Sequence, residues 1–280
     1  MFESIEQTRR LWGPARKTLP GWRQIRGVMP VYDEPLYYEI AFSFVDIPRQ
    51  VDLFEEFVEK YSKIPVRRVL DIGCGPSQQL RELARRGYEA VGLDRSPRML
   101  AYLRERAGEE GVRVSTVEAD MTGFTLDGPA DLALILMGTI GLIGSREGLL
   151  SHLDSVARSL KGGGLYVMEN LKLNWHSPDY LGSQTWTMER GGVRVETTYS
   201  VELTDALKQM LSETLRLDVD DQGKKRSFEE TIETRAFFPQ EFVALVDLNG
   251  EFEFLGYFER SSTRRLTEAL PDNIALLRRR

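Results

Sequence analysis

The chain has 280 residues, of which 41% are hydrophobic and 29% are charged, enough apolar material for one large domain or for a domain with a substantial insertion. Its 37 Lys and Arg against 43 Asp and Glu give a net charge of −6, which argues against nucleic acid as a partner. The single cysteine, Cys74, cannot form an intramolecular disulfide, and the charged first residues do not form the apolar core of a secretory signal. We therefore predict a cytoplasmic protein with no membrane partner.

The first two thirds of the chain predict helices followed by a parallel sheet. Residues 36–61 have the spacing of one or two amphipathic helices that cover a sheet. From residue 66 to residue 170, short Val-, Ile- and Leu-rich strands alternate with amphipathic helices, which is typical of a parallel sheet. The predicted strands are residues 67–72, 88–94, 112–120, 131–137 and 162–170, and the predicted helices are residues 78–86, a helix capped by Ser96, and residues 148–160.

The period changes after Asn170. Three stretches alternate strongly between polar and apolar residues, with Arg190-Gly191-Gly192 and Asp221-Gln222-Gly223 as turn signals; they are residues 184–202, 209–220 and 225–237. The tail returns to a helix opened by Pro239 and to strands at residues 251–259 and 273–279. The predicted fold class is α/β: a doubly wound, mostly parallel, seven-stranded Rossmann-like sheet with an inserted antiparallel β cap.

The central motif is a glycine-spaced turn after the first strand of the sheet. Asp71 stands at the end of that strand, and Gly73 and Gly75 let the backbone turn tightly and approach a ligand closely. Asp94 ends the second strand, 23 residues further on, where an acid can accept hydrogen bonds from ribose hydroxyls. The combination predicts a nucleoside cofactor.

A nicotinamide cofactor is the competing interpretation. Its fingerprint needs a third glycine and a helix start that is open to pyrophosphate, but Gln78 occupies the third position. Asp71 would place a negative charge beside the pyrophosphate, whereas it suits the ammonium group of a methionine moiety. The charge therefore favours a cationic cofactor.

Four segments, VLDIGCG, VGLDRSPRML, VEADM and LILMGTIGLI, resemble successive signature segments of class I S-adenosylmethionine-dependent methyltransferases. The resemblance covers about residues 38–171 and implies S-adenosyl-L-methionine as the cofactor. It implies that Asp94 binds the ribose, that Asp120 and Met121 bind the adenine, and that Gly73 and the region near Met137 hold the methionine part. The predicted cofactor-binding set is Tyr38, Asp71, Gly73, Cys74, Gly75, Asp94, Arg95, Met99, Asp120, Met121 and Met137, and no metal site is predicted.

A finer resemblance is to amino-sugar N-methyltransferases and, more loosely, to the glycine N-methyltransferase group. Residues 38–42 are similar to the tyrosine-acid segment before the first strand of those enzymes, and LMGTIGLI is similar to their loop after strand four. The sugar enzymes often have a histidine in that loop, where this chain has Leu142. The resemblance implies a small-molecule acceptor and favours nitrogen over oxygen as the methylated atom.

Methyl transfer needs alignment and exclusion of water more than it needs a base. An amine acceptor only has to arrive without its extra proton, whereas a hydroxyl acceptor needs a base within hydrogen-bond reach. The candidate catalytic residues are His176 and Tyr38, with Glu169 as another candidate base. His176 is equally consistent with an exposed loop residue, and Tyr38 fits a lid near the sulfonium better than an acid or base. We assign no role to His152.

The predicted division of the chain follows these elements. Residues 1–60 form a helical segment over the cofactor site, residues 61–170 the cofactor-binding core, residues 171–238 the substrate cap, and residues 239–280 the completion of the sheet. Substrate identity is expected in the cap, where the side chains of interest are Trp175, Tyr180, Trp186, Tyr199 and Arg235, although most of these aromatics also suit a small core of the cap itself.

Three alternatives stay open besides N-methylation of a small molecule. One is O-methylation of a small hydroxy compound. Another is a nucleic-acid methyltransferase, although Leu136-Met137-Gly138-Thr139 stands where such enzymes commonly have Asn or Asp followed by Pro-Pro and an aromatic residue. The last is a cofactor-binding protein without catalysis. Another copy of this chain, in a homo-oligomer, is a further candidate partner.

Overall fold

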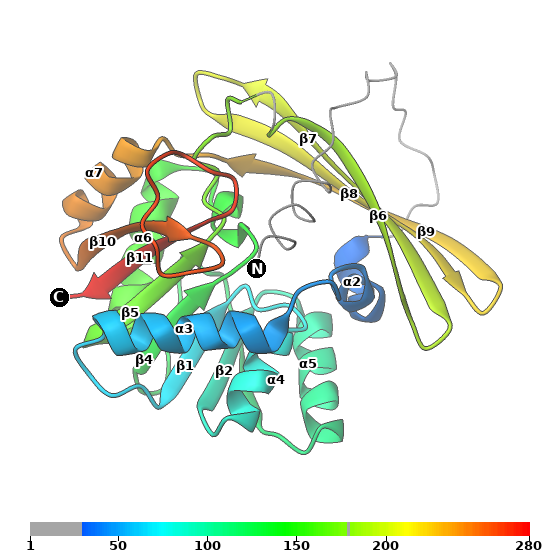
Figure 1. Cartoon of the computed structure of the whole chain (residues 1–280), viewed down its shortest axis with the longest axis horizontal. Helices are drawn as coiled ribbons and strands as arrows, with labels where there is room; N and C mark the ends of the chain where they lie inside the picture. The colour runs from blue at the N-terminus through cyan, green and yellow to red at the C-terminus, as the bar shows by residue number, and fades with distance from the viewer. Residues whose placement is uncertain (1–29, 178–179) are drawn as a thin grey trace. The chain divides into compact units, whose positions relative to one another are not determined.

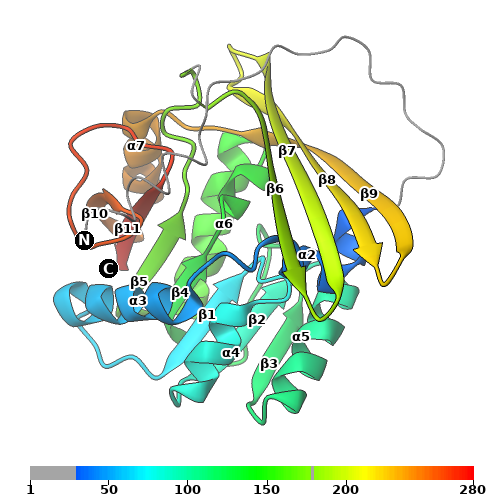
Figure 2. The same ribbon diagram turned by 45° about the vertical axis from the view of Figure 1, so that its right-hand side comes forward.

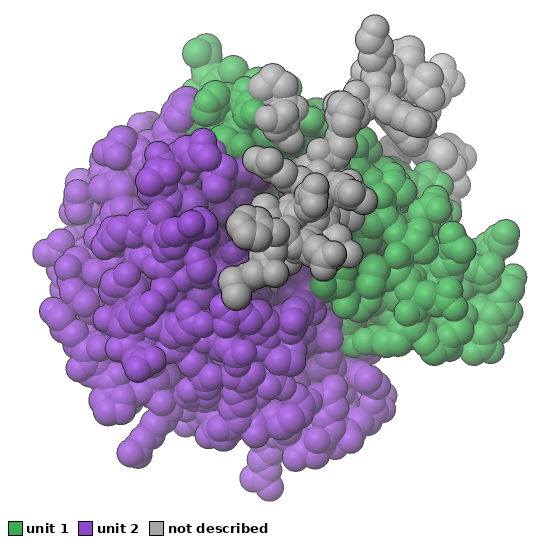
Figure 3. Space-filling model, viewed as in Figure 1, with its two compact units in different colours: residues 1–44, 174–234 green, residues 45–173, 235–280 purple. Residues whose placement is uncertain are grey.

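The computed structural model describes residues 30–177 and 180–280, and the chain divides into two compact units (Figure 3). We call residues 1–44 and 174–234 the antiparallel unit, and residues 45–173 and 235–280 the parallel-sheet unit. The predicted N-terminal segment falls partly outside the described residues, since residues 1–29 are not described. None of the helices in the described part of the chain is long and apolar enough to cross a membrane.

The parallel-sheet unit contains a seven-stranded sheet in the order β10-β11-β5-β4-β1-β2-β3. Strands β1 to β5 pair in parallel, and β11 runs antiparallel to both β5 and β10. The order reverses at β1, which lies between β4 and β2, and such a switch point is where open α/β sheets bind ligands. The strands are β1 (Arg68–Ile72), β2 (Glu89–Asp94), β3 (Val114–Glu118), β4 (Ala130–Ile135), β5 (Leu160–Glu169), β10 (Phe252–Glu259) and β11 (Asn273–Arg279).

Helices cover both faces of this sheet (Figure 1). One face packs α3, α4 and α5 against side chains such as Val69 and Leu134, and the other packs α6 and α7 against side chains such as Leu70 and Ile135. The alternation follows from strand geometry, because successive side chains point to opposite faces. The helices are α3 (Ile47–Tyr61), α4 (Gln78–Arg85), α5 (Pro97–Glu109), α6 (Arg146–Ser159) and α7 (Pro239–Asn249), with a short 3-10 helix η2 (Thr139–Leu142).

Serine side chains start the helices that follow the strands. The hydroxyl oxygen of Ser77 accepts from the Leu80 amide at 3.1 Å, that of Ser96 from Met99 at 3.3 Å, and that of Ser145 from Gly148 at 2.9 Å. These caps satisfy amides that a helix start leaves without partners. They fix where each helix begins relative to the strand before it, and the predicted cap at Ser96 is confirmed.

The antiparallel unit contains a four-stranded sheet in the order β6-β7-β8-β9, whose strands run side by side in Figure 2. Val195, Leu217 and Phe228 face α2 and share a core with Ile40 and Ala41, while the opposite face is polar. The elements are η1 (Val31–Asp33), α2 (Pro35–Ala41), β6 (Gly182–Arg190), β7 (Val193–Asp205), β8 (Met210–Asp221) and β9 (Lys224–Arg235).

Two tight turns set the register of this sheet. Gly191 and Gly192 have φ of 60° and 80°, and Gln222 and Gly223 have φ of 52° and 88°. Consecutive residues with positive φ form the turn that matches the twist of paired strands. Both predicted turns are confirmed, and the alternating stretch at residues 184–202 is a hairpin of two strands, β6 and β7. The predicted fold class, with seven strands and a separate antiparallel sheet, is confirmed.

Candidate functional site

The loop after β1 leaves its backbone open on one side. Gly73 has a φ of +64°, and a Cβ atom there would lie 2.5 Å from Cγ2 of Thr139, so a larger residue would be strained and would displace the Thr139 side chain. Gly75 has a φ of +53°, and a Cβ atom there would meet nothing within 4 Å. The first glycine is therefore required by the protein's own packing. The second leaves space in which a ligand can lie against the backbone.

Asp71 is the buried acid behind this loop. It is 2% exposed, and its carboxylate accepts a hydrogen bond from the Ser77 hydroxyl at 2.7 Å. Burial, together with the negative charges of Asp94 and Glu169, raises the pKa of Asp71 to about 7, although the hydrogen bond from Ser77 opposes the change. A positive charge beside Asp71 would relieve this penalty, so the site favours a cationic group.

Asp94 joins the loops that follow β1 and β2. One carboxylate oxygen accepts from the Gly75 amide at 2.8 Å, and the other accepts from the Ser96 amide at 2.8 Å. Each oxygen keeps a further lone pair for a hydroxyl donor. The acid is half-buried, so it is both a brace for the two loops and an acceptor at their surface.

The other predicted residues of these two loops have different environments. Cys74 is 8% exposed, burial raises the pKa of its thiol well above the ordinary value, and its amide donates to the Leu93 carbonyl at 2.9 Å. Arg95 is exposed, whereas Met99 is 2% exposed and lies on the inner side of α5. The thiol of Cys74 is therefore a neutral packing group, and Met99 has the burial of a core residue.

Asp120 and Met121 form the start of the loop after β3. A carboxylate oxygen of Asp120 accepts from the amide and the hydroxyl of Thr122, at 2.8 and 2.5 Å. These two bonds lower the pKa of Asp120, so the exposed side chain is a carboxylate near neutral pH. Met121 is half-buried against the core, and its carbonyl oxygen lies 2.8 Å from Nδ1 of His152.

The loop after β4 has an unusual backbone. Met137 and Gly138 have φ of 54° and 74°, and Asn170 at the end of β5 has a φ of 58°. A side chain such as that of Met137 rarely adopts this conformation, and such strain is common at functional sites. A Cβ atom at Gly138 would lie 3.3 Å from the carbonyl oxygen of Asn170, so the two loops lie against each other.

Glu169 holds this strained loop. It is 1% exposed, and one carboxylate oxygen accepts from the Met137 amide at 3.0 Å. The other oxygen accepts from Gln50 and Arg260, both at 2.8 Å, and Gln79 donates to Gln50 at 2.9 Å. The sequence offers Glu169 as a candidate base. Its Oε1 accepts two hydrogen bonds, and its Oε2 accepts the Met137 amide and keeps one lone pair. The conformation of the loop after β4 therefore depends on this carboxylate.

Gln50, Gln79, Arg260 and His152 contact the candidate site residues or their partners, and the sequence gives none of them a role. The first three come from α3, from α4 and from the segment after β10, and nothing in their spacing shows that they meet at Glu169. His152 gives a signal that could have been used. It shares a helical face with Leu149, Leu153 and Val156, which are all fully buried, so the helical spacing itself places the imidazole inside the protein.

Tyr38 and His176 both belong to the antiparallel unit. The ring of Tyr38 lies 4.8 Å from that of Phe42 and 5.7 Å from that of Tyr32. His176 is exposed, and its ring meets the buried Trp175 edge-on at 5.7 Å. Their predicted roles beside the methyl donor stay predictions.

The remaining side chains of interest take part in packing and pairing within their own units. Trp186 donates to the Ala41 carbonyl at 2.7 Å, and the Tyr199 hydroxyl donates to Glu213 at 2.5 Å. Arg235 forms an ion pair with Glu241 at 2.7 Å and lies over the ring of Phe237. Trp175 is 4% exposed and Tyr180 is half-buried. Trp186 and Tyr199 thus contribute to the structure of the antiparallel unit.

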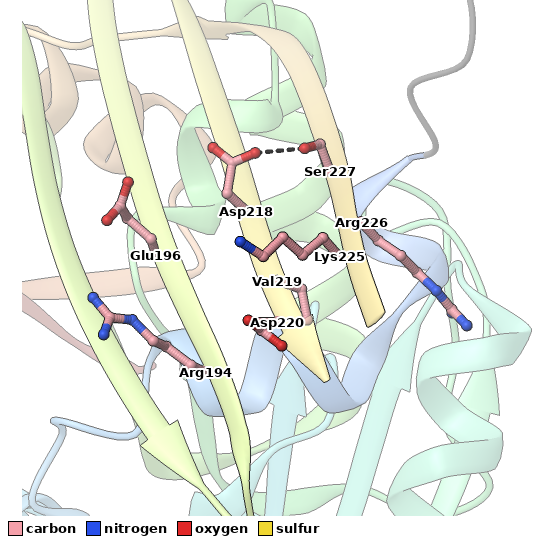
Figure 4. A pocket seen from close by; sticks show the side chains of 8 residues that line it. All are labelled: Arg194, Glu196, Asp218, Val219, Asp220, Lys225, Arg226 and Ser227. Carbon is pink, nitrogen blue, oxygen red and sulfur yellow. Dashed lines mark hydrogen bonds between the residues drawn. The ribbon is translucent and has the colours of Figure 1, made fainter. Parts of the chain in front are cut away.

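The polar face of the antiparallel sheet carries an open hollow of about 530 Å³ (Figure 4). Three basic and three acidic side chains line it, and Asp218 accepts from the Ser227 hydroxyl at 2.5 Å. Because the two signs balance, the hollow does not select a ligand by charge. The lining residues are Arg194, Glu196, Asp218, Val219, Asp220, Lys225, Arg226 and Ser227, none of which is a predicted site residue.

Comparisons with known proteins agree with the parallel-sheet unit. Residues 69–164 match a family described as a methyltransferase domain. The chain is 27% identical over 157 residues to a carboxy-S-adenosyl-L-methionine synthase of Nautilia profundicola, which covers 52% of this chain and 63% of that protein. The chain spans less than two thirds of the length of the curated relatives that it matches first.

Solved structures show the same fold at low sequence identity. An S-adenosylmethionine-dependent methyltransferase from Clostridium acetobutylicum aligns with a TM-score of 0.72 and 17% identity, over 87% of this chain and 96% of that one. The sugar N-methyltransferase KedS8 from Streptoalloteichus aligns with a TM-score of 0.68 and 20% identity, over 95% of this chain and 100% of that one. The resemblance to class I methyltransferases is confirmed.

Proposed function

We propose, from the match of residues 69–164 to a methyltransferase domain, that the protein transfers the methyl group of S-adenosylmethionine to a nitrogen atom of a small molecule. When bound, S-adenosylmethionine supplies an electrophilic methyl group that a nitrogen lone pair can displace from sulfur. The chain's own residues have to hold the cofactor, orient the acceptor and keep water out.

The observation that carries the proposal is the environment of Asp71. The carboxyl group is 2% exposed, with a pKa raised to about 7, and the loop beside it has open space at Gly75. An ammonium group in that space would compensate the buried charge, as the methionine part of the cofactor offers. A pyrophosphate there would add negative charge near Asp71, Asp94 and Glu169, so a nicotinamide cofactor fits poorly.

Asp94 and Asp120 suit the remaining parts of the cofactor. Asp94 ends β2 with lone pairs available for the ribose hydroxyls, and its oxygens are fixed by the amides of Gly75 and Ser96. Asp120 follows β3 and is held as a carboxylate by Thr122, so it can accept from the adenine amino group. Because the two acids follow neighbouring parallel strands, they share one edge of the sheet.

Three observations support nitrogen in a small molecule as the acceptor. The net charge of −6 disfavours a polyanionic substrate. Glu169, the buried candidate base, is bound to Arg260 and Gln50, and an amine acceptor needs no base once it has lost its proton. A sugar N-methyltransferase shares the fold. O-methylation with His176 as the base is the alternative that the exposed imidazole keeps open.

Calorimetry and turnover together test this function. We expect the protein to bind S-adenosylhomocysteine and not NAD, and to transfer a labelled methyl group to an amine in a panel of small amines and hydroxy compounds. Binding of NAD without binding of S-adenosylhomocysteine would overturn the cofactor assignment. Transfer to hydroxy compounds alone would overturn the choice of nitrogen.

A further inference from the structure

A histidine with no place in the proposed chemistry lies buried behind the loop that starts at Asp120. His152 on α6 is 0% exposed, and both of its ring nitrogens have partners. Nδ1 lies 2.8 Å from the carbonyl oxygen of Met121, and Nε2 lies 2.6 Å from the hydroxyl oxygen of Tyr166 on β5. The imidazole therefore joins the central sheet to the loop after β3.

The partners fix the direction of both hydrogen bonds. Burial lowers the pKa of His152 to about 4, so the imidazole is neutral near pH 7 and carries one proton. The Met121 carbonyl can only accept, so Nδ1 carries that proton and Nε2 accepts from the Tyr166 hydroxyl. The arrangement is fully satisfied, and each bond holds the ring in one orientation.

A serine on the same helix holds the next residue of the loop. The Ser151 hydroxyl donates to the Thr122 carbonyl at 2.7 Å, whereas the Ser155 hydroxyl lies 3.3 Å from that oxygen and has its shorter hydrogen bond, at 2.9 Å, to the Ser151 carbonyl. Thr122 in turn donates to the Asp120 carboxylate through its amide and hydroxyl. Consecutive carbonyls of the loop are thus fixed from α6, and the orientation of Asp120 depends on the residue that they fix.

We propose that His152 is a positioning residue for adenine recognition, which holds the Asp120–Thr122 loop in the conformation that binds the adenine amino group. This inference rests on the proposed function, because it assigns a ligand to that loop. Tyr166 acts through His152 by fixing the orientation of its ring. A leucine at this position would fill space but would leave the Met121 carbonyl without its donor.

The position of the loop, rather than the stability of the fold, is what the test has to measure. We compare binding of S-adenosylhomocysteine with binding of S-inosylhomocysteine, in which an oxygen replaces the adenine amino group, by calorimetry. The wild-type protein is expected to prefer the adenine ligand by about tenfold, as one charge-assisted hydrogen bond provides. A protein that binds neither ligand would refute the proposed function itself.

His152→Leu is expected to lose most of this preference. It should still bind the inosine ligand within about twofold of wild type, because the contacts to the rest of the ligand are intact. His152→Asn, whose amide nitrogen can stand near the position of Nδ1, should recover at least half of the preference on a logarithmic scale. A purely structural role predicts a different pattern, with equal losses for both ligands and an unchanged ratio. That pattern would overturn the inference.

Tyr166→Phe gives a second test if His152→Leu does not fold, since it removes only the hydroxyl group. The matched control is Tyr257→Phe, because the Tyr257 hydroxyl donates to the Pro239 carbonyl at 2.8 Å in the same unit. We expect the preference for adenine to fall by about threefold in Tyr166→Phe and to stay at the wild-type value in the control. An equal preference in the two variants would overturn the inference.

Discussion

The two units use their buried polar groups in different ways. In the parallel-sheet unit three of these groups hold backbone: Asp94 binds the Gly75 amide, Glu169 the Met137 amide, and His152 the Met121 carbonyl. In the antiparallel unit the buried carboxylates pair with other side chains, as in the Arg190–Glu39 ion pair and the hydrogen bond from Tyr199 to Glu213. A group that holds backbone determines the shape of a loop. A side-chain pair can be replaced as a pair.

This difference indicates where each part of the proposed function lies. Loops of fixed shape suit a cofactor that never changes, and the three backbone bonds lie in loops that follow β1, β3 and β4. The acceptor-binding cap role predicted for the antiparallel unit stays a prediction, as do the cytoplasmic location and the oligomeric state.

The largest effect on activity is expected at Glu169, because its removal frees the strained loop. Glu169→Ala should also lower the free energy of unfolding by about 1 to 3 kcal/mol, since the Met137 amide loses its acceptor and Arg260, whose side chain is 29% exposed, keeps only Asp272 at 3.6 Å. Methyl transfer should fall strongly, because the Met137 amide is no longer held. Urea unfolding and a turnover assay measure the two losses.

Glu169→Gln is the matched control, because it keeps the shape and an oxygen for the Met137 amide. It should recover part of the activity, and Arg260 should keep only its longer ion pair with Asp272. If Glu169→Ala unfolded like wild type, backbone bracing by buried acids would not distinguish the two units, and the comparison above would fail.

Asp71 predicts a pH dependence of the protein without cofactor. Its pKa in the folded chain is raised to about 7 from 3.8, so the folded state binds a proton that the unfolded state has already lost. The stabilisation from that proton is complete below pH 4 and is lost as the pH rises through 7. Asp71→Asn should remove this loss of about 4 kcal/mol, since each pKa unit corresponds to 1.36 kcal/mol.

Urea unfolding of wild type and Asp71→Asn at pH 5 and pH 8 measures this difference. The two proteins should differ more at pH 8, where the wild-type carboxyl group is charged and buried. Asn keeps an oxygen that can accept from the Ser77 hydroxyl. Parallel stability curves at the two pH values would show that the carboxyl group is not desolvated, and the charge argument for a cationic cofactor would lose its basis.

Replacing Asp94 should weaken ligand binding more than it destabilises the fold. Asp94→Ala should weaken binding of S-adenosylhomocysteine by about 1.5 to 3 kcal/mol, which is the range of hydrogen bonds to a charged group. Asp94→Asn keeps one acceptor oxygen and should lose less. Calorimetry measures both. An affinity equal to wild type in Asp94→Ala would mean that this acid only braces the loops and does not contact the ribose.

The fold could be predicted almost completely from the sequence, because each of its signals is local. Hydrophobic alternation identified the strands, Ser96 and Pro97 the start of α5, and paired positive-φ turns the hairpins of the second sheet. The antiparallel stretch at residues 184–202 was harder to interpret, since its period continues across the turn at Gly191 and Gly192. Only the glycines mark two strands there.

The bracing of the candidate site could not be predicted in the same way, because its parts are distant in sequence. Glu169 meets Gln50, 119 residues earlier, and Arg260, 91 residues later. Each of these side chains is of a polar or charged type that is usually found at the protein surface. The positive φ of Met137 is equally invisible, because nothing in a methionine indicates that a buried acid will hold its amide.

His176 is expected to have the smallest effect, and it tests the choice of nitrogen. Since an amine acceptor loses its proton before transfer, His176→Ala should reduce turnover by less than about tenfold, and the pH midpoint of the rate should follow the acceptor's own pKa. His176→Phe is the matched control, because it keeps an aromatic ring beside Trp175 and removes the titratable group. If turnover falls in His176→Ala but not in His176→Phe, the loss reflects packing of the ring rather than acid-base chemistry. Loss of about a hundredfold or more in both variants is the size expected of a general base, and it would make His176 that base and a hydroxyl group the acceptor.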